Sequence, residues 1–345
     1  MNVGQIIDCV TEWVELYGRH TPGFCGAHLM GGITTLPKDA EFPTYRDVDV
    51  NIVLHDLEQR EIQDFAYKGL IVECGLFSRE EYRSLADVLA SPELAPNLVV
   101  DSILADPTGM LARLHQAVAQ AYPRREWVSA RCEYMKRGVV QALNDMQQAR
   151  SPAEGLVHLV RLVFDMAGLI AVAQLQPPTH RRCLILMREL LAPQGELALY
   201  EAVLHLLGVA HLSSQRVESF LEDCASAFDH AVAVYRTPIP YGFKLHAHVR
   251  PYLVDGAQEM IAAGNHREAM LWIMGFSYIA NTAIQQDAPA DERARFRAQF
   301  ERLLHELGLD TLQAWHASLG QARSLADAIF TVADAIVANH PAIRP

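Results

Sequence analysis

Hydrophobic residues follow two different periods along the chain, and the change comes near residue 125. Before it, a helix-like opening is followed by short apolar runs with the alternation and composition of β-strands. These strands are predicted at residues 24–30, 47–54, 70–77 and 97–104. Helices are predicted over residues 78–90, where Ser78 and Glu81 form a capping box, and over residues 110–122, after the turn sequence DPTG. The first part of the chain is therefore an α/β unit.

Beyond Tyr122 almost every segment has the 3.6-residue period of a helix, and one helix begins clearly with Ser151 as N-cap and Pro152 at the first helical position. The helices are predicted at residues 151–173, 180–192, 195–208, 214–235, 247–264, 266–286, 290–308 and 324–339. We therefore predict an α+β fold. A mixed sheet with flanking helices forms a domain of residues 1–125, and an all-α domain of residues 126–345 follows.

The composition is that of a soluble globular protein, with half of its 345 residues hydrophobic. No secretory signal is evident at the start, and charged residues interrupt the most apolar stretch, so we expect a cytoplasmic protein without a membrane partner. Six scattered cysteines without a C-x-x-C pair indicate neither a zinc site nor a disulfide framework. The net charge of -12 argues against extended nucleic acid as a partner and fits a cationic small molecule or a protein.

The sequence DVDVNIVL places two aspartates inside an apolar strand, against the usual strand preference. Its alternation puts Val48 and Val50 on one face and Asp47 and Asp49 on the other, about 7 Å apart along the strand. Two carboxylates held this close repel each other unless a cation joins them. Mg²⁺ is the natural partner because it binds one or two carboxylates and keeps positions for substrate phosphates.

Two glycines, Gly31 and Gly32, end the strand that precedes this one. Glycine allows the backbone to turn sharply with its N–H groups exposed, which suits a phosphate chain. A glycine pair alone is common. A strand, a glycine pair, a spacer and alternating aspartates together are much more specific, and they predict a site for a metal ion and a nucleotide.

At these residues the chain resembles the polymerase β-like nucleotidyltransferase superfamily. The matching pattern is Met30-Gly31-Gly32 followed by Asp47-Val48-Asp49-Val50, and the two-domain layout looks most like the aminoglycoside and lincosamide nucleotidyltransferases. The resemblance implies a third acidic residue on a neighbouring strand. Glu73 matches best, with Asp101 as the reserve. The spacer before Asp47 is slightly long, and Gly32 stands where the family usually has serine, so Thr34 or Thr35 would supply a hydroxyl to the triphosphate.

The resemblance also implies an activity. It implies that Asp47, Asp49 and Glu73 hold two Mg²⁺ ions. A nucleoside monophosphate is then transferred from a nucleoside triphosphate to a hydroxyl of a small molecule, and pyrophosphate is released. ATP is the nucleotide that we expect first. Asp165 has two readings: an ion pair with Arg161, or a general base supplied by the helical domain, as in some relatives. The alternatives are a protein acceptor, or a nucleotide-binding or interaction module that kept the fold and lost turnover.

Overall fold

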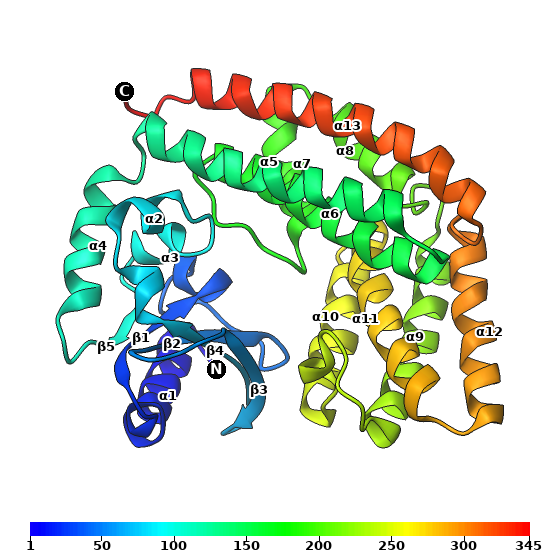
Figure 1. Cartoon of the computed structure of the whole chain (residues 1–345), viewed down its shortest axis with the longest axis horizontal. Coiled ribbons are helices and arrows are strands. Elements are labelled where there is room, and N and C mark those ends of the chain that lie inside the picture. The colour runs from blue at the N-terminus through cyan, green and yellow to red at the C-terminus, as the bar shows by residue number, and fades with distance from the viewer. The chain divides into compact units, whose positions relative to one another are not determined.

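The computed structural model describes residues 1–345, which divide into two compact units (Figure 1). The α/β unit consists of Met1–Tyr134 together with Val172–Pro178 and Ile336–Pro345. The helical unit consists of Met135–Ala171 and Thr179–Ala335. A mixed sheet lies in the first unit, and helices make up the second, so the fold is α+β as predicted.

A five-stranded sheet with the order β3-β4-β2-β1-β5 forms the centre of the α/β unit. The strands are β1 Phe24–Met30, β2 Asp47–Leu54, β3 Glu61–Tyr67, β4 Leu70–Ser78 and β5 Ile103–Ala105, and the helices are α1 Val3–Leu16, α2 Leu85–Ala90, α3 Ala95–Leu98, α4 Met110–Ala121 and the start of α5 Arg125–Gln148. Strands β2 and β4 pair in parallel, and the other neighbours are antiparallel. The sheet is therefore mixed.

Helices cover both faces of this sheet (Figure 1). Helix α1 buries its apolar stripe, Ile6, Val10 and Val14, against the valines of β2. On the other face, α2, α3 and α4 bury Val88, Leu98 and other apolar side chains over one end of the strands.

The predicted strands 24–30 and 47–54 are confirmed with the same bounds, and β4 extends one residue beyond the predicted strand. Of the strand predicted at 97–104, only residues 103 and 104 are in a strand, β5. Asn97 and Leu98 belong to the short helix α3, which has Pro96 in its first turn, and a bend follows it. The edge strand β3 was not among the predicted strands. The Ser78–Glu81 capping box is present, but it caps a separate 3₁₀ turn at Arg79–Tyr82.

The helical unit is built from packed helices, most of them joined by short connections, and two 3₁₀ turns lie in the longer connection from α9 to α10. They are α6 Pro152–Ala173, α7 Cys183–Leu191, α8 Leu197–Leu206, α9 Ser214–Val234, α10 Arg250–Ala262, α11 His266–Asp287, α12 Ala290–Glu306 and α13 Leu312–Asn339, together with most of α5. Helix α6 is long and apolar enough to cross a bilayer, but 72% of its most apolar stretch is buried in the protein. Its burial is that of a core helix.

A buried arginine connects two helix ends in the α/β unit. The Arg131 guanidinium is fully buried and donates to the carbonyl oxygens of Leu89, near the end of α2, and Tyr122, after α4, both at 2.8 Å. The guanidinium carbon, Cζ, also lies 4.2 Å from the centre of the Tyr122 ring. A positive charge at the carboxyl end of a helix is favourable because the last carbonyl groups lack partners and carry the negative end of the helix dipole. Arg131 is thus a structural residue.

Replacing this arginine should destabilise the protein. In Arg131→Met two buried carbonyl groups lose their donors, each at about 1–3 kcal/mol, so we expect the free energy of unfolding to fall by about 2–6 kcal/mol. Arg124→Met is the matched control, since that side chain is 54% exposed and its ion pair with Glu126 is long, at 3.9 Å. Urea denaturation measures both. Equal losses in the two variants would contradict the structural role of Arg131.

Candidate metal centre

The alternation predicted for β2 places its aspartates as expected. Val48 and Val50 have no exposed surface and pack in the core beneath α1. Asp47 and Asp49 are half-buried and point to the opposite face, because successive side chains of a strand alternate. The apolar positions therefore hold the strand in a register that presents both carboxylates together.

The neighbouring strand adds a third carboxylate. Strands β2 and β4 run parallel in register, with Asp49 opposite Glu73 and Asp47 opposite Ile71. Directly opposed residues share one face of a sheet. The ligand atoms of Asp47, Asp49 and Glu73 all lie within 4.8 Å of one another. Asp101, the reserve candidate, is not part of this cluster. It is exposed in a bend before β5, which is the edge strand on the far side of β1 from β2.

The donors in this cluster are all carboxylate oxygens. Nitrogen and sulfur ligands, which zinc and other soft ions favour, are not among them. Three carboxylates at this separation repel one another, and a divalent cation between them removes that repulsion. The cluster therefore suits a hard cation such as Mg²⁺, which prefers oxygen ligands.

The glycine pair lies directly beside the cluster. Gly31 follows the last residue of β1 with a φ of 72°, in the left-handed region, and starts a 3₁₀ turn that runs to Thr35. A Cβ atom at Gly31 would overlap Oδ2 of Asp49. Gly32 has no heavy atom within 4 Å of its Cβ position and is exposed. Of the two glycines, only Gly31 is thus required by the geometry of the metal centre.

The two threonines of this turn stabilise the turn itself. The Thr34 hydroxyl donates to the Gly31 carbonyl at 2.8 Å, and the Thr35 hydroxyl donates to the Gly32 carbonyl at 3.0 Å. Both hydroxyl oxygens keep their acceptor lone pairs. Contacts of either threonine with a triphosphate remain a prediction.

A fourth carboxylate extends the same row of side chains. Asp64 on β3 lies opposite Glu73 in the antiparallel β3–β4 pair and is only 8% exposed. The row across the sheet is thus Asp49, Glu73 and Asp64, on three adjacent strands. Asp64 was not among the predicted site residues, because no strand was predicted at residues 61–67. The available signal was the pair of aromatic residues Phe65 and Tyr67, two positions apart and directly before the turn sequence Lys68-Gly69.

Behind the carboxylates, the same face carries a buried network of neutral polar groups. The His28 ring donates from Nδ1 to the Leu29 carbonyl at 3.0 Å, so its Nε2 accepts the Tyr82 hydroxyl at 2.8 Å. Burial lowers the pKa of His28 to about 4 and raises that of Tyr82, so both are uncharged at neutral pH. Asn51 bonds to Tyr82 and donates to the sulfur of Met30. This network fills the sheet face beyond the carboxylates without adding charge.

Asp165 lies in the helical unit, on α6. Its carboxylate packs against α5, because a Cβ atom at Gly138 would come within 2.8 Å of Oδ2. Burial raises the pKa of Asp165 to about 6, although the Arg161 guanidinium, 3.8 Å away, lowers it. The ion pair between these residues is therefore present but long. A role for Asp165 as general base remains a prediction.

Stability should depend on the protonation of Asp165. The folded protein holds this proton more tightly than the unfolded chain, so the free energy of unfolding should fall as pH rises from about 4 to about 6. Asp165→Asn removes the buried charge, and we expect it to stabilise the protein at pH 7.5 and to change little at pH 4. Urea denaturation at both pH values measures this. The same difference in the free energy of unfolding between Asp165→Asn and wild type at both pH values would contradict this prediction.

Three basic side chains of the α/β unit contact structural partners. Lys68 pairs with Glu12 at 2.6 Å, and Arg125 donates to the Val337 carbonyl at 2.8 Å. Arg46 lies over the Phe42 ring, 5.9 Å from its centre. None of these contacts identifies a triphosphate ligand.

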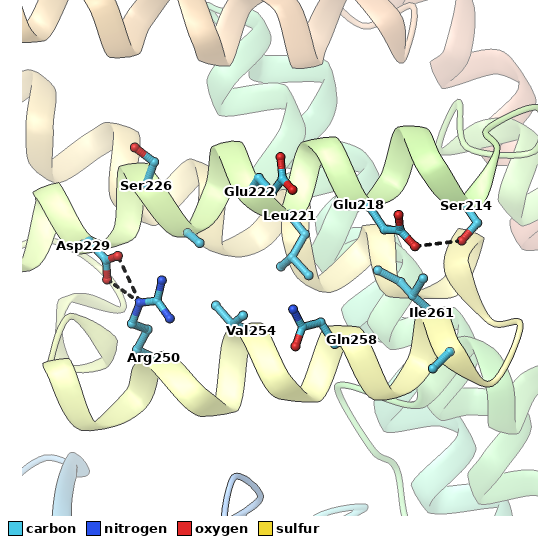
Figure 2. Close-up of a pocket in the computed structure, with 12 residues that line it drawn as sticks. Ser214, Glu218, Leu221, Glu222, Ser226, Asp229, Arg250, Val254, Gln258 and Ile261 are labelled. Atoms are coloured by element: carbon cyan, nitrogen blue, oxygen red, sulfur yellow. Dashed lines mark hydrogen bonds and ion pairs between the residues drawn. The ribbon is translucent and has the colours of Figure 1, made fainter.

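The helical unit has an open groove of about 960 Å³ between α9 and α10. Figure 2 shows Asp229 and Arg250 paired at one end and the Ser214–Glu218 hydrogen bond at the other. Glu222 lies between them on α9. Three carboxylates and one guanidinium make the lining acidic, so this groove favours cationic over anionic ligands.

Comparisons with known proteins add little to this geometry. No family model matches the chain, and no curated protein matches it. Among solved structures, the chain is similar to a nucleotidyltransferase-like protein from Exiguobacterium sibiricum 255-15, at 12% identity and a TM-score of 0.31, over 95% of this chain and 91% of that one. A TM-score of this size carries no argument about activity. The case for a function therefore rests on the carboxylate cluster and on the strands that hold it.

Proposed function

We propose that this protein is a Mg²⁺-dependent nucleotidyltransferase that moves a nucleoside monophosphate from a nucleoside triphosphate to a hydroxyl of a small molecule, releasing pyrophosphate. One observation carries the proposal: Asp47, Asp49 and Glu73 converge within 4.8 Å on two parallel strands, beside a left-handed glycine turn. This is the arrangement that the sequence resemblance leads us to expect. ATP is the first nucleotide to test.

The donor set fits Mg²⁺, because it offers only carboxylate oxygens and leaves positions for phosphate oxygens. When bound, such ions neutralise the triphosphate and lower the pKa of an acceptor hydroxyl. The three carboxylates would hold the metal, and the Gly31–Gly32 turn would lie along the phosphates. The protein's contribution is then position and charge, which is the usual basis of catalysis in phosphoryl transfer.

We propose Asp165 as the general base that removes the proton from the acceptor hydroxyl. A carboxylate with a pKa of about 6 is partly ionised near neutral pH and can both take and return a proton. Its elevated pKa supports the proposal, since catalytic acids and bases often have perturbed pKa values. The ion pair with Arg161 is the competing structural role.

The charge balance supports a cationic acceptor. The chain carries a net charge of -12, and the α9–α10 groove is acidic. Opposite charge raises the local concentration of a cationic substrate. We place the protein in the cytoplasm, where nucleoside triphosphates and Mg²⁺ are abundant.

Pyrophosphate release tests the proposal. The wild type is incubated with Mg²⁺, each of the four nucleoside triphosphates and panels of cationic, neutral and protein acceptors. We expect one nucleotide and one acceptor class to give pyrophosphate together with an acceptor whose mass increases by one nucleoside monophosphate. Binding of Mg²⁺-nucleotide without turnover on any acceptor would favour the interaction-module alternative. Absence of both binding and turnover would reject the proposed function.

A further inference from the structure

The position of the Asp49 carboxylate depends on the peptide at Gly31. Asp49 Oδ2 occupies the place that a Cβ atom of Gly31 would take. This contact exists because β1 and β2 pair up to Met30 and Asp49, where β1 ends. If the Gly31 peptide rotated, the carboxylate would lose the surface that it packs against. Something outside the strand pair must therefore fix this peptide.

The side chain of Asn97 makes that connection. Its Oδ1 accepts the Gly31 N–H at 3.0 Å, and its Nδ2 donates to the Glu93 carbonyl at 2.6 Å. Asn97 is 4% exposed, and its own carbonyl accepts the Ser102 hydroxyl at 2.5 Å. A carboxamide is suited to this place because it accepts on one side and donates on the other. Its orientation is therefore fixed at both ends.

Neither the 3₁₀ turn nor the strand ladder provides an acceptor for the Gly31 N–H. It lies at the start of a 3₁₀ turn, where the first N–H groups have no acceptor within the turn. The residue before it ends β1, so the strand ladder does not continue to Gly31. Glycine in the left-handed region can also change its backbone angles at little cost. The Thr34 hydroxyl holds the carbonyl side of Gly31, and the bond to Asn97 is thus the side-chain restraint on the peptide that carries the Gly31 N–H.

We propose that Asn97 is a positioning residue of the metal centre: by holding the Gly31 peptide, it keeps the Asp49 carboxylate where it can bind a divalent cation together with Asp47 and Glu73. The proposal rests on the proposed function, since it requires that this cluster binds a metal ion. Residues that orient metal ligands typically contribute a factor of about 10–100 in metal affinity.

Mn²⁺ binding tests this without any need for turnover. The free Mn²⁺ signal in electron paramagnetic resonance gives the affinity of the wild type, and Asp49→Asn gives the background from other carboxylates. We expect Asn97→Ala to weaken the Asp49-dependent affinity about 10–100-fold. Asn97→Ser is a second variant, polar but too short to reach Gly31, and should show a similar loss. Circular dichroism checks that each variant is folded.

Ser102→Ala is the matched control. It removes a buried hydrogen bond to the main chain of Asn97 and leaves the side chain of Asn97 in place. We expect this variant to lose stability and to keep its Mn²⁺ affinity within about threefold of wild type. If the Asn97 variants lost affinity only through a general loss of packing, Ser102→Ala would lose affinity as well. Folded Asn97 variants with wild-type affinity, or an equal loss in Ser102→Ala, would overturn the role of Asn97. A wild type with no more affinity than Asp49→Asn would overturn the metal site itself.

Discussion

Asp49→Asn is expected to reduce nucleotidyl transfer more than about a hundredfold while leaving the protein folded. A metal ion at this site supplies several kcal/mol of stabilisation to the transition state, and each 1.4 kcal/mol is a factor of ten in rate. Asp47→Asn and Glu73→Gln should have similar effects, because their ligand atoms lie in the same cluster. Pyrophosphate release under saturating Mg²⁺ and nucleotide measures the loss.

The stability of these variants separates a metal centre from a structural cluster. Removing one of three neighbouring carboxylates relieves repulsion, so the free energy of unfolding without metal should change by less than about 1 kcal/mol. Asp101→Asn is the matched control, an exposed carboxylate of the same unit that lies outside the cluster, and it should keep full activity. Equal activity of Asp49→Asn and Asp101→Asn would contradict the proposed site.

Gly31→Ala should have the second largest effect. Its φ of 72° costs an alanine about 1–2 kcal/mol, and the new Cβ atom would overlap Asp49 Oδ2. The carboxylate must then move away from Asp47 and Glu73. We therefore expect a loss of at least about 1 kcal/mol in stability together with a tenfold or larger loss of Mn²⁺ affinity.

Gly32→Ala is the natural comparison, since it makes the same substitution one residue further along the turn. Its Cβ atom would meet no heavy atom within 4 Å, so stability should stay within about 0.5 kcal/mol of wild type and Mn²⁺ affinity should not change. If Gly32→Ala were as damaging as Gly31→Ala, the contact between Gly31 and Asp49 would not explain the requirement for glycine.

The centre of the site could be predicted because its signals are local. Alternation in DVDVNIVL fixes which residues of β2 face the core, and that strand was predicted with its observed bounds. The place of Glu73 beside Asp49 came from the family resemblance, and the parallel register of β2 and β4 agrees with it.

The surrounding residues could not be predicted because their positions depend on tertiary contacts. In EIQDFAY only Phe65 and Tyr67 give an apolar alternation, as is common for an edge strand, so Asp64 was overlooked. The run around Leu98 is apolar enough for a strand, but Leu98 ends a short buried helix and packs in one core cluster with residues of α4. Asn97 belongs to that helix, and its bond to Gly31 joins residues 66 positions apart.

The most direct test of the account is thermal unfolding of the wild type and Asp49→Asn with each nucleoside triphosphate, with and without Mg²⁺. Ligands that bind the folded state stabilise it by mass action, by about 2.7 kcal/mol at a concentration a hundredfold above the dissociation constant. We expect one nucleotide to stabilise the wild type only when Mg²⁺ is present, and Asp49→Asn to lose most of this stabilisation. A wild type that shows no Mg²⁺-dependent shift with any nucleotide up to millimolar concentrations would contradict it.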